Sequence, residues 1–288
     1  MQALAYYLGF PFIYILASLP FRALYAVSDV ICLLIRLSGY RREVIRTNLR
    51  KSFPEKSEDE IRQLSRAYYS YMCDLMVETF KTMKMTEAEH HERVKIENPE
   101  VLQPFFDKKQ SIALALGHYG NWEWYGPSVT LNTPYQLVVI YRPLTNPYFE
   151  RMMTRMRTRF GTEITPTHQT LRTMAANKNR VTALAFVADQ AAPANAYWTN
   201  FLHQDTSVFT GLEKLASRFN YPVVYLHSKR ISRGHYTIRF EVMYHEPSKT
   251  SDNEISEAFT RRLEKDIIQE PVIWLWSHKR WKHTRPTV

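Results

Sequence analysis

Three changes in the pattern of apolar and polar positions divide the chain into segments with different expected structures. Residues 1–21 carry no charged side chain. A capping box, Ser57 to Glu60, opens a segment whose apolar residues recur at helical spacing to about Lys84. Beyond this segment the apolar residues gather in short runs, as in buried strands, at 111–117, 136–141, 181–187, 222–227 and 236–243.

The order of these segments predicts the fold class. Segments with helical character separate the first three short runs, and residues 251–269 predict one more helix. Alternating strands and helices favour a mostly parallel sheet that is covered on both faces. We therefore predict an α/β fold: a single domain over 41–288, with a mostly parallel central sheet flanked by helices. Hydrophobic membrane-attachment helices over 1–40 are expected to precede it.

The charge-free N-terminal run leaves three interpretations open. It is just long enough to cross a bilayer, which needs about 20 apolar residues, but Gly9, Pro11 and Pro20 interrupt it. It could form helices embedded in or lying on a membrane, a single span, or ordinary core helices. Basic residues follow it, and by the positive-inside rule they keep the rest of the chain cytoplasmic. They are Arg36, Arg41, Arg42, Arg46, Arg50 and Lys51.

Composition narrows the classes of function. The 288 residues are 45% hydrophobic and 14% aromatic, which excludes a disordered chain, and a mean hydropathy of −0.37 excludes a multi-span membrane protein. The 38 Lys and Arg against 28 Asp and Glu give a net charge of +10, which indicates an anionic partner. No glycine pattern of a nucleotide-binding loop occurs, and no histidine or cysteine spacing predicts a metal site.

One block, LALGHYGNWEWYGP, combines features of a catalytic site. It follows the most apolar predicted strand, at the end where open α/β sheets bind ligands. His118 and Glu123 are five residues apart, which on one continuous helix puts them about 140° off a shared face. If His118 lies instead in the glycine-rich turn and Glu123 in the following helix, the carboxylate can reach the imidazole. Such a pair is a general base oriented by an acid.

The G-H-x-G-N-W-E pattern around His118 resembles the signature of the bacterial late lipid A acyltransferases, members of the glycerolipid acyltransferase superfamily with its H-x-x-x-x-[DE] motif. Five further blocks resemble this family in the same order, at 46–55, 141–147, 189–190, 210–216 and 276–286. One segment departs from the family pattern, because Leu202 and His203 replace a phenylalanine–glycine pair. This departure favours an atypical substrate.

The resemblance implies a membrane-associated enzyme of lipid A biosynthesis on the cytoplasmic face of a bacterial inner membrane. It would transfer a fatty acyl chain from a thioester, expected on acyl carrier protein, to a hydroxyl of a lipid A precursor or similar lipid. No cofactor is implied beyond acyl carrier protein or acyl coenzyme A as co-substrate. Because the chain lacks a G-x-S-x-G elbow, we expect direct attack by the acceptor oxygen, with His118 as base and Glu123 as its partner.

Four more residues are candidates for the site. Arg142 follows the next predicted strand and could stabilise the oxyanion or bind a phosphate. Asp189 and Gln190, at another strand end, and Asn121 are expected to contact the acceptor or to support other site residues, Asp189 by bracing Arg142. The alternative for each is a purely structural role, as a salt bridge or a satisfied buried polar group.

The basic residues suggest partners. Those between 150 and 180 could dock an acidic carrier protein or form a solvated face, and the tryptophan-rich basic tail suits a membrane interface. We expect acyl carrier protein, a lipid acceptor and an anionic membrane as partners, and no nucleic acid. Two alternatives stay open: an acyltransferase for another amphiphile, such as a glycolipid or amino-acid lipid, with acyl coenzyme A as a possible donor; or a non-catalytic basic protein that binds membranes or nucleic acid.

Overall fold

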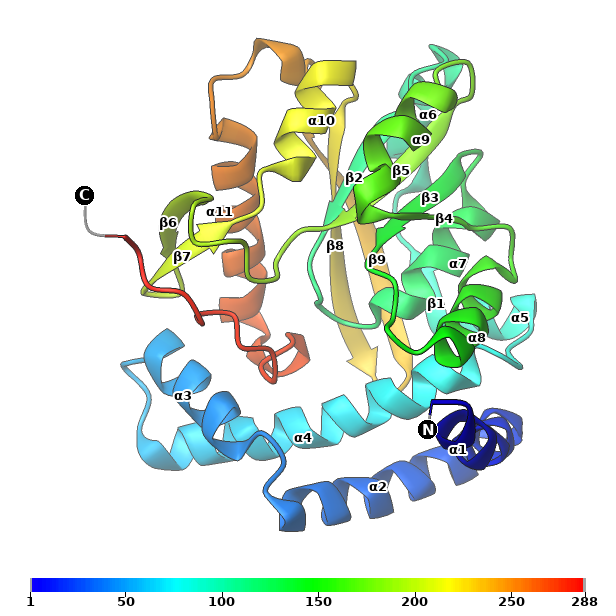
Figure 1. Cartoon of the computed structure of the whole chain (residues 1–288), viewed down its shortest axis with the longest axis vertical. Helices are drawn as coiled ribbons and strands as arrows, with labels where there is room; N and C mark the ends of the chain where they lie inside the picture. Colours follow the sequence, from blue (N-terminus) through cyan, green and yellow to red (C-terminus); the bar gives the residue numbers. More distant parts are fainter. Residues whose placement is uncertain (1, 287–288) are drawn as a thin grey trace.

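The computed structural model describes residues 2–286, and within them the chain forms an α/β fold around a seven-stranded sheet (Figure 1). The strand order is β1-β9-β8-β2-β5-β3-β4. Strands β8 and β9 pair antiparallel and the other neighbours pair parallel, so the predicted mostly parallel central sheet is confirmed. The strands are β1 (Val94–Ile96), β2 (Ile112–Leu116), β3 (Gln136–Tyr141), β4 (Glu163–Pro166), β5 (Thr182–Val187), β8 (Val223–Ser232) and β9 (His235–Tyr244).

Helices cover both faces of this sheet. In β2, Ala113 and Ala115 pack toward α10 and α11, while Leu114 and Leu116 pack toward α7. A strand buried on both faces must be apolar throughout, which explains the uninterrupted run in the sequence. The helices on the sheet domain are α5 (Glu87–Arg93), α6 (Gln103–Asp107), α7 (Trp122–Asn132), α8 (Pro147–Thr158), α9 (Thr170–Ala176), α10 (Gly211–Phe219) and α11 (Glu254–Gln269).

The remaining elements are small. A separate antiparallel hairpin is formed by β6 (Tyr197–Phe201) and β7 (Gln204–Val208). Leu202 and His203, the pair that departs from the family pattern, form its turn, both with positive φ. Single turns of 3-10 helix occur at Pro99–Leu102, Thr167–Gln169, Pro247–Lys249 and Pro271–Ile273.

Four helices at the N-terminal end lie below the carboxyl ends of the parallel strands (Figure 1). They are α1 (Gln2–Ser18), α2 (Phe21–Ser38), α3 (Arg42–Ser52) and α4 (Glu58–Lys81). The charge-free run is therefore divided at Leu19 and Pro20 between two helices. No helix within residues 2–286 has both the length and the apolar character that a membrane crossing requires. Of the expected segments 1–40 and 41–288, residues 1, 287 and 288 lie outside the described residues.

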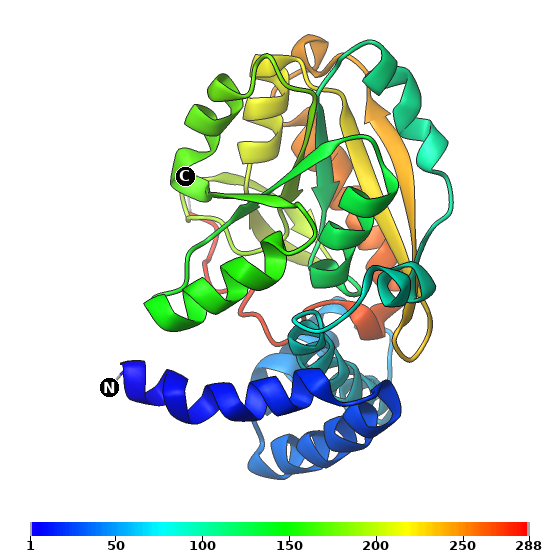
Figure 2. The ribbon, with the colours of Figure 1, turned by 90° about the vertical axis from the view of Figure 1, so that its right-hand side faces the viewer.

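Helix α1 is held against the rest of the protein at both ends. Lys81 in α4 donates hydrogen bonds to the carbonyls of Ala17 (3.1 Å) and Leu19 (2.8 Å), which α1 itself leaves unpaired. Near the other end, Tyr6 stacks on Tyr148 of α8, with 5.7 Å between ring centroids. Helix α1 consequently lies flat beneath α8 instead of projecting from the molecule (Figure 2).

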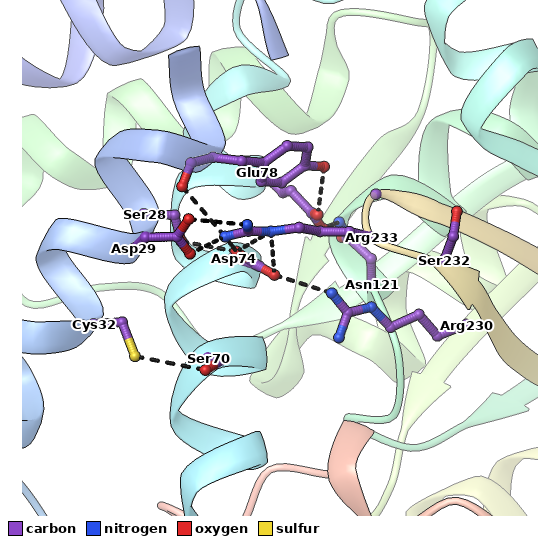
Figure 3. Close-up of polar contacts among 12 residues, drawn as sticks. Ser28, Asp29, Cys32, Ser70, Asp74, Glu78, Asn121, Arg230, Ser232 and Arg233 are labelled. Atoms are coloured by element: carbon purple, nitrogen blue, oxygen red, sulfur yellow. Dashed lines mark hydrogen bonds and ion pairs between the residues drawn. The ribbon is translucent and has the colours of Figure 1, made fainter. Parts of the chain in front are cut away.

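A buried polar network joins α2, α4 and the β8–β9 hairpin (Figure 3). The Asp74 carboxylate in α4 accepts a hydrogen bond from Ser28 of α2 (2.8 Å) and pairs with Arg230 (3.0 Å) and Arg233 (2.6 Å). One turn further along α4, the buried Glu78 accepts hydrogen bonds from Tyr25, Tyr236 and Asn121. This network ties the N-terminal helices to the turn that precedes α7.

The C-terminal segment contradicts part of the expected membrane-facing tail. Trp274 and Trp276 are buried in the hydrophobic core, and Arg280 is buried as well. The ring centroids of Trp274 and Trp276 lie 4.7 Å apart, and Trp274 also packs edge-on against Phe201 of β6. These side chains close the core beside the sheet, so the expectation of a membrane contact is wrong for them.

Candidate active site

His118 lies in a tight turn between β2 and α7, and two glycines make this turn possible. A Cβ atom on Gly117 would lie 2.8 Å from Leu263 and 3.2 Å from the Asp189 carboxylate. Gly120 has φ of +66°, and a Cβ atom there would lie 1.9 Å from the Tyr125 hydroxyl. The turn therefore places the imidazole at the carboxyl end of the sheet, as the sequence predicts.

The carboxylate that contacts His118 is Asp189. The Nδ1 atom of His118 lies 2.6 Å from Oδ1 of Asp189, and the His118 backbone N–H donates to Oδ2 at 2.8 Å. The topology explains this contact, because β2 and β5 are parallel neighbours with Leu116 opposite Val187. His118 and Asp189 each lie two residues beyond this pair, so both chains leave the sheet side by side.

Further hydrogen bonds fix the charge and position of the pair. Trp274 donates from its indole nitrogen to Oδ2 of Asp189 at 2.8 Å. Burial raises the pKa of the Asp189 carboxyl, but the charge and hydrogen bonds of His118 and the bond from Trp274 lower the pKa by more. Asp189 is therefore ionised at neutral pH and holds Nδ1–H of His118. Nε2 faces the Gln190 amide nitrogen, 3.2 Å away.

Glu123 does not have the predicted partner. Both of its carboxylate oxygens accept hydrogen bonds from Arg157 of α8, at 2.6 and 3.0 Å, in a bidentate ion pair. The expectation that Glu123 orients the imidazole is thus wrong in this structure, and Asp189 takes that place. The planar guanidinium of Arg157 pairs with both carboxylate oxygens at once, which a single imidazole nitrogen cannot do.

The other predicted residues have separate places. Arg142 is exposed in the cavity wall described below, and Asp189 does not brace it, since both Asp189 oxygens are used by His118 and Trp274. Asn121 is buried as the N-cap of α7, where its oxygen accepts from the Trp124 backbone N–H at 3.1 Å. It supports the turn rather than lining the cavity.

A cavity of about 840 Å³ opens beside His118. Its polar wall contains His118, Glu123, Arg142, Arg157 and Gln190. The other lining residues lie on both faces of the sheet and are mostly apolar. The apolar lining on the α7 side is Leu114, Leu116, Val129, Leu137 and Leu226, and on the α10 side it is Phe186, Phe209, Leu212 and Leu215. Such a cavity fits a ligand with a reactive polar group and a hydrocarbon chain.

Sequence reasoning missed two residues of this site. In the sequence, Arg157 is one of several basic residues between 150 and 180, and Trp274 is one of the tryptophans of the basic tail. Arg157 contacts Glu123, and Trp274 contacts Asp189, across 34 and 85 residues of sequence. No local spacing pattern predicts contacts that depend on the tertiary fold. Leu202 and His203 are absent from the described cavity wall, so their departure from the family pattern does not shape it.

Comparison with known proteins agrees with the geometry. A search of curated proteins finds no match. A family model described as bacterial lipid A biosynthesis acyltransferase matches residues 1–283, almost the whole chain. With this match along its length, and with a histidine–carboxylate pair beside a largely apolar cavity, the chain belongs to the bacterial lipid A biosynthesis acyltransferase family and is an acyltransferase.

Proposed function

We propose that this acyltransferase moves a fatty acyl chain from a thioester, carried by acyl carrier protein, to a hydroxyl of a lipid A precursor or similar lipid. One observation supports this most directly: His118, held by the buried Asp189, lines a cavity that has both polar and apolar lining residues. A thioester carbonyl bound there has its hydrocarbon chain in the apolar part and its reacting carbon beside the imidazole.

The proposed reaction needs no acyl-enzyme. His118 Nε2 accepts the proton of the acceptor hydroxyl while the oxygen attacks the thioester carbonyl carbon and forms the new C–O bond. The tetrahedral intermediate then collapses, the C–S bond breaks, and the imidazolium returns the proton to the thiolate. Asp189 keeps Nδ1 protonated and stabilises the imidazolium between these two steps.

The two arginines in the cavity wall suit different tasks. Arg157 is fixed by its bidentate bond to Glu123, so it can offer positive charge to the developing oxyanion without reorganising. Burial lowers the pKa of Arg157, but the Glu123 carboxylate raises it by more, so the charge is retained. Arg142 is exposed, which suits a phosphate of the acceptor or of the donor's pantetheine arm. Glu123 then acts through Arg157.

The surroundings of the site support the proposed partners. Exposed basic residues in α8, in α9 and just after each of these helices offer a basic surface for an acidic carrier protein: Arg151, Arg155, Arg159, Arg172 and Lys178. Beneath α8, helices α1 and α2 expose large apolar side chains, which we assign to the cytoplasmic face of the inner membrane. We call the following residues the N-terminal apolar surface: Leu4, Leu8, Phe12, Ile15, Val30, Leu33, Leu34 and Leu37.

Purified protein tests this function. It is incubated with a labelled acyl chain on acyl carrier protein or on coenzyme A, together with a lipid A precursor or a bacterial membrane lipid extract. We expect the label to appear in an ester of the lipid, faster from the carrier protein. Transfer only from coenzyme A, or only to a different amphiphile, would replace the donor or the acceptor in the proposal. No transfer from either thioester would contradict it.

A further inference from the structure

Gly126 is a glycine that neither the backbone nor the packing of α7 requires. It lies in the helix interior with an ordinary helical φ, unlike Gly120. A Cβ atom on Gly126 would meet a single atom within 4 Å, Leu137 Cδ2 at 4.0 Å, unlike one on Gly117. Glycine destabilises a helix interior relative to alanine, so its presence here calls for another reason.

The missing side chain opens onto the cavity. Gly126 and Leu137 both line it on the α7 side of the sheet. Helix α7 begins at Trp122 beside His118 and runs away from the cavity mouth, so Gly126 lies about 6 Å along its axis. Leu137 lies near the start of β3, about 13 Å along the strand from Tyr141 in the same wall. A hydrocarbon chain that reaches this part of the cavity therefore lies against the bare backbone of Gly126 and beside Leu137.

We propose that Gly126 determines the length of the acyl chain that the enzyme accepts. This inference rests on the proposed function and adds a specificity-determining residue to it. The space beside Leu137 admits methylene groups only because residue 126 has no side chain. A Cβ atom at position 126 clashes with nothing, so alanine fits there, and a longer side chain would extend from it into the cavity. Chains that end before this point keep their binding, and longer chains lose it.

The experiment compares wild type, Gly126→Ala and Gly126→Leu with a ladder of saturated chains from octanoyl to hexadecanoyl on acyl carrier protein. For Gly126→Leu we expect kcat/KM for the best wild-type chain to fall at least about tenfold, equivalent to about 1.4 kcal/mol. The best chain should become shorter by two carbons or more, with kcat/KM for that chain within about threefold of wild type. Gly126→Ala should give a smaller shift and a Tm about 2 °C higher.

A matched control comes from the other side of the sheet. Gly211 in α10 also lines the cavity, and a Cβ atom there meets nothing within 4 Å. Because Gly211 lies on the α10 side, Gly211→Leu leaves the space beside Leu137 open, so the best chain length should stay that of wild type; a shift to shorter chains in Gly211→Leu but not in Gly126→Leu would overturn the inference. If Gly126→Leu lowers kcat/KM equally at all lengths, or leaves the preference unchanged, the inference is overturned.

A binding measurement separates this inference from the proposed function. Displacement of a fluorescent fatty acid by unlabelled saturated fatty acids measures the affinity for each chain length without turnover. Weaker binding of long fatty acids to Gly126→Leu, together with an inactive wild type, would uphold the chain site and overturn the proposed function. If wild type and variant bind all lengths with equal affinity, or wild type binds none, the inference about Gly126 fails.

Discussion

At the scale of single residues, Asp189 is the group on which the site depends most. It is buried and accepts hydrogen bonds from the His118 ring, the His118 backbone and Trp274. The two bonds from His118 hold the imidazole against Asp189, and the bond from Trp274 holds the Asp189 carboxylate in place. A second histidine–aspartate pair, His227 and Asp266 at 2.9 Å, lies outside the described cavity wall and has no place in the proposed reaction.

Asp189→Asn should lower kcat by a factor of about 10²–10⁴, because the amide neither fixes the tautomer of His118 nor stabilises its imidazolium. The measurement is acyl transfer under saturating donor and acceptor. Asp266→Asn is the matched control, since it removes a carboxylate from the other pair, and folded protein should keep its kcat within about threefold of wild type. Equal losses in both variants would indicate that the Asp189 effect is structural.

The lowered pKa of the buried His90 makes the stability of the protein depend on pH. Its ring is buried against Phe160, both ring nitrogens lack a hydrogen-bond partner among the described residues, and burial, helped by Arg159, lowers its pKa from 6.5 to about 4. Between these values the unfolded chain binds a proton that the folded protein excludes, so stability rises with pH. We expect the free energy of unfolding to fall by up to about 3 kcal/mol from pH 6.5 to pH 4.

In His90→Leu this part of the pH dependence should disappear, and the variant should be at least as stable as wild type at pH 5 because no unpaired ring is buried. Urea unfolding at several pH values measures both effects. An unchanged pH dependence in the variant would show that other groups cause it.

At the scale of elements, two buried carboxylates, Asp74 and Glu78, attach the N-terminal helices to the β8–β9 hairpin, and Asp74 forms the ion pairs. Asp74 joins α2 and α4 to Arg230 and Arg233, whereas Asp29 in α2 contacts Arg233 from an exposed position. Asp74→Ala should lower the free energy of unfolding by about 3–5 kcal/mol, because it leaves the largely buried guanidinium of Arg230 without its carboxylate. Asp29→Ala should cost about 0.2–1 kcal/mol. Urea denaturation of the two variants compares them, and similar losses would contradict the importance of burial.

The elements also show what can be inferred from sequence. The runs at 136–141 and 236–243 correspond to Gln136–Tyr141 and His235–Tyr244. The first is almost wholly apolar, whereas in the second buried apolar residues alternate with the exposed Arg239 and Glu241. β6 and β7 were missed, since their exposed positions carry polar residues such as Asn200 and Asp205. Sequence placed His118 and Asp189 at strand ends, but their contact depends on β2 and β5 being neighbours, which is a property of strand order.

At the scale of the whole molecule, three features determine how the protein would bind its substrates. They are the cavity, the basic surface on α8 and α9, and the N-terminal apolar surface. The positive net charge and the exposed apolar residues both favour an anionic lipid surface. Because α1 is held flat against α4 and α8, we expect it to lie on the membrane near the cavity rather than to extend away from it.

Vesicle binding tests this arrangement. Leu33→Glu with Leu34→Glu should weaken binding to phosphatidylglycerol-containing vesicles at least about tenfold, because two exposed leucines no longer enter the lipid. Ile268→Glu, an exposed position on α11, is the control and should bind as wild type does. Co-sedimentation at low and high salt gives the affinities. Equal binding of the double variant and wild type would contradict the assignment of this surface.

The most direct test of the account is single-turnover transfer of a labelled acyl chain by wild type and His118→Ala, with the mass of the protein recorded during the reaction. We predict that wild type forms the lipid ester with no acylated protein at any time. His118→Ala should fold and bind the donor, but should transfer the chain at least about 10²-fold more slowly. Transfer at the wild-type rate by His118→Ala, or an acylated protein that precedes the ester, would contradict the proposed mechanism.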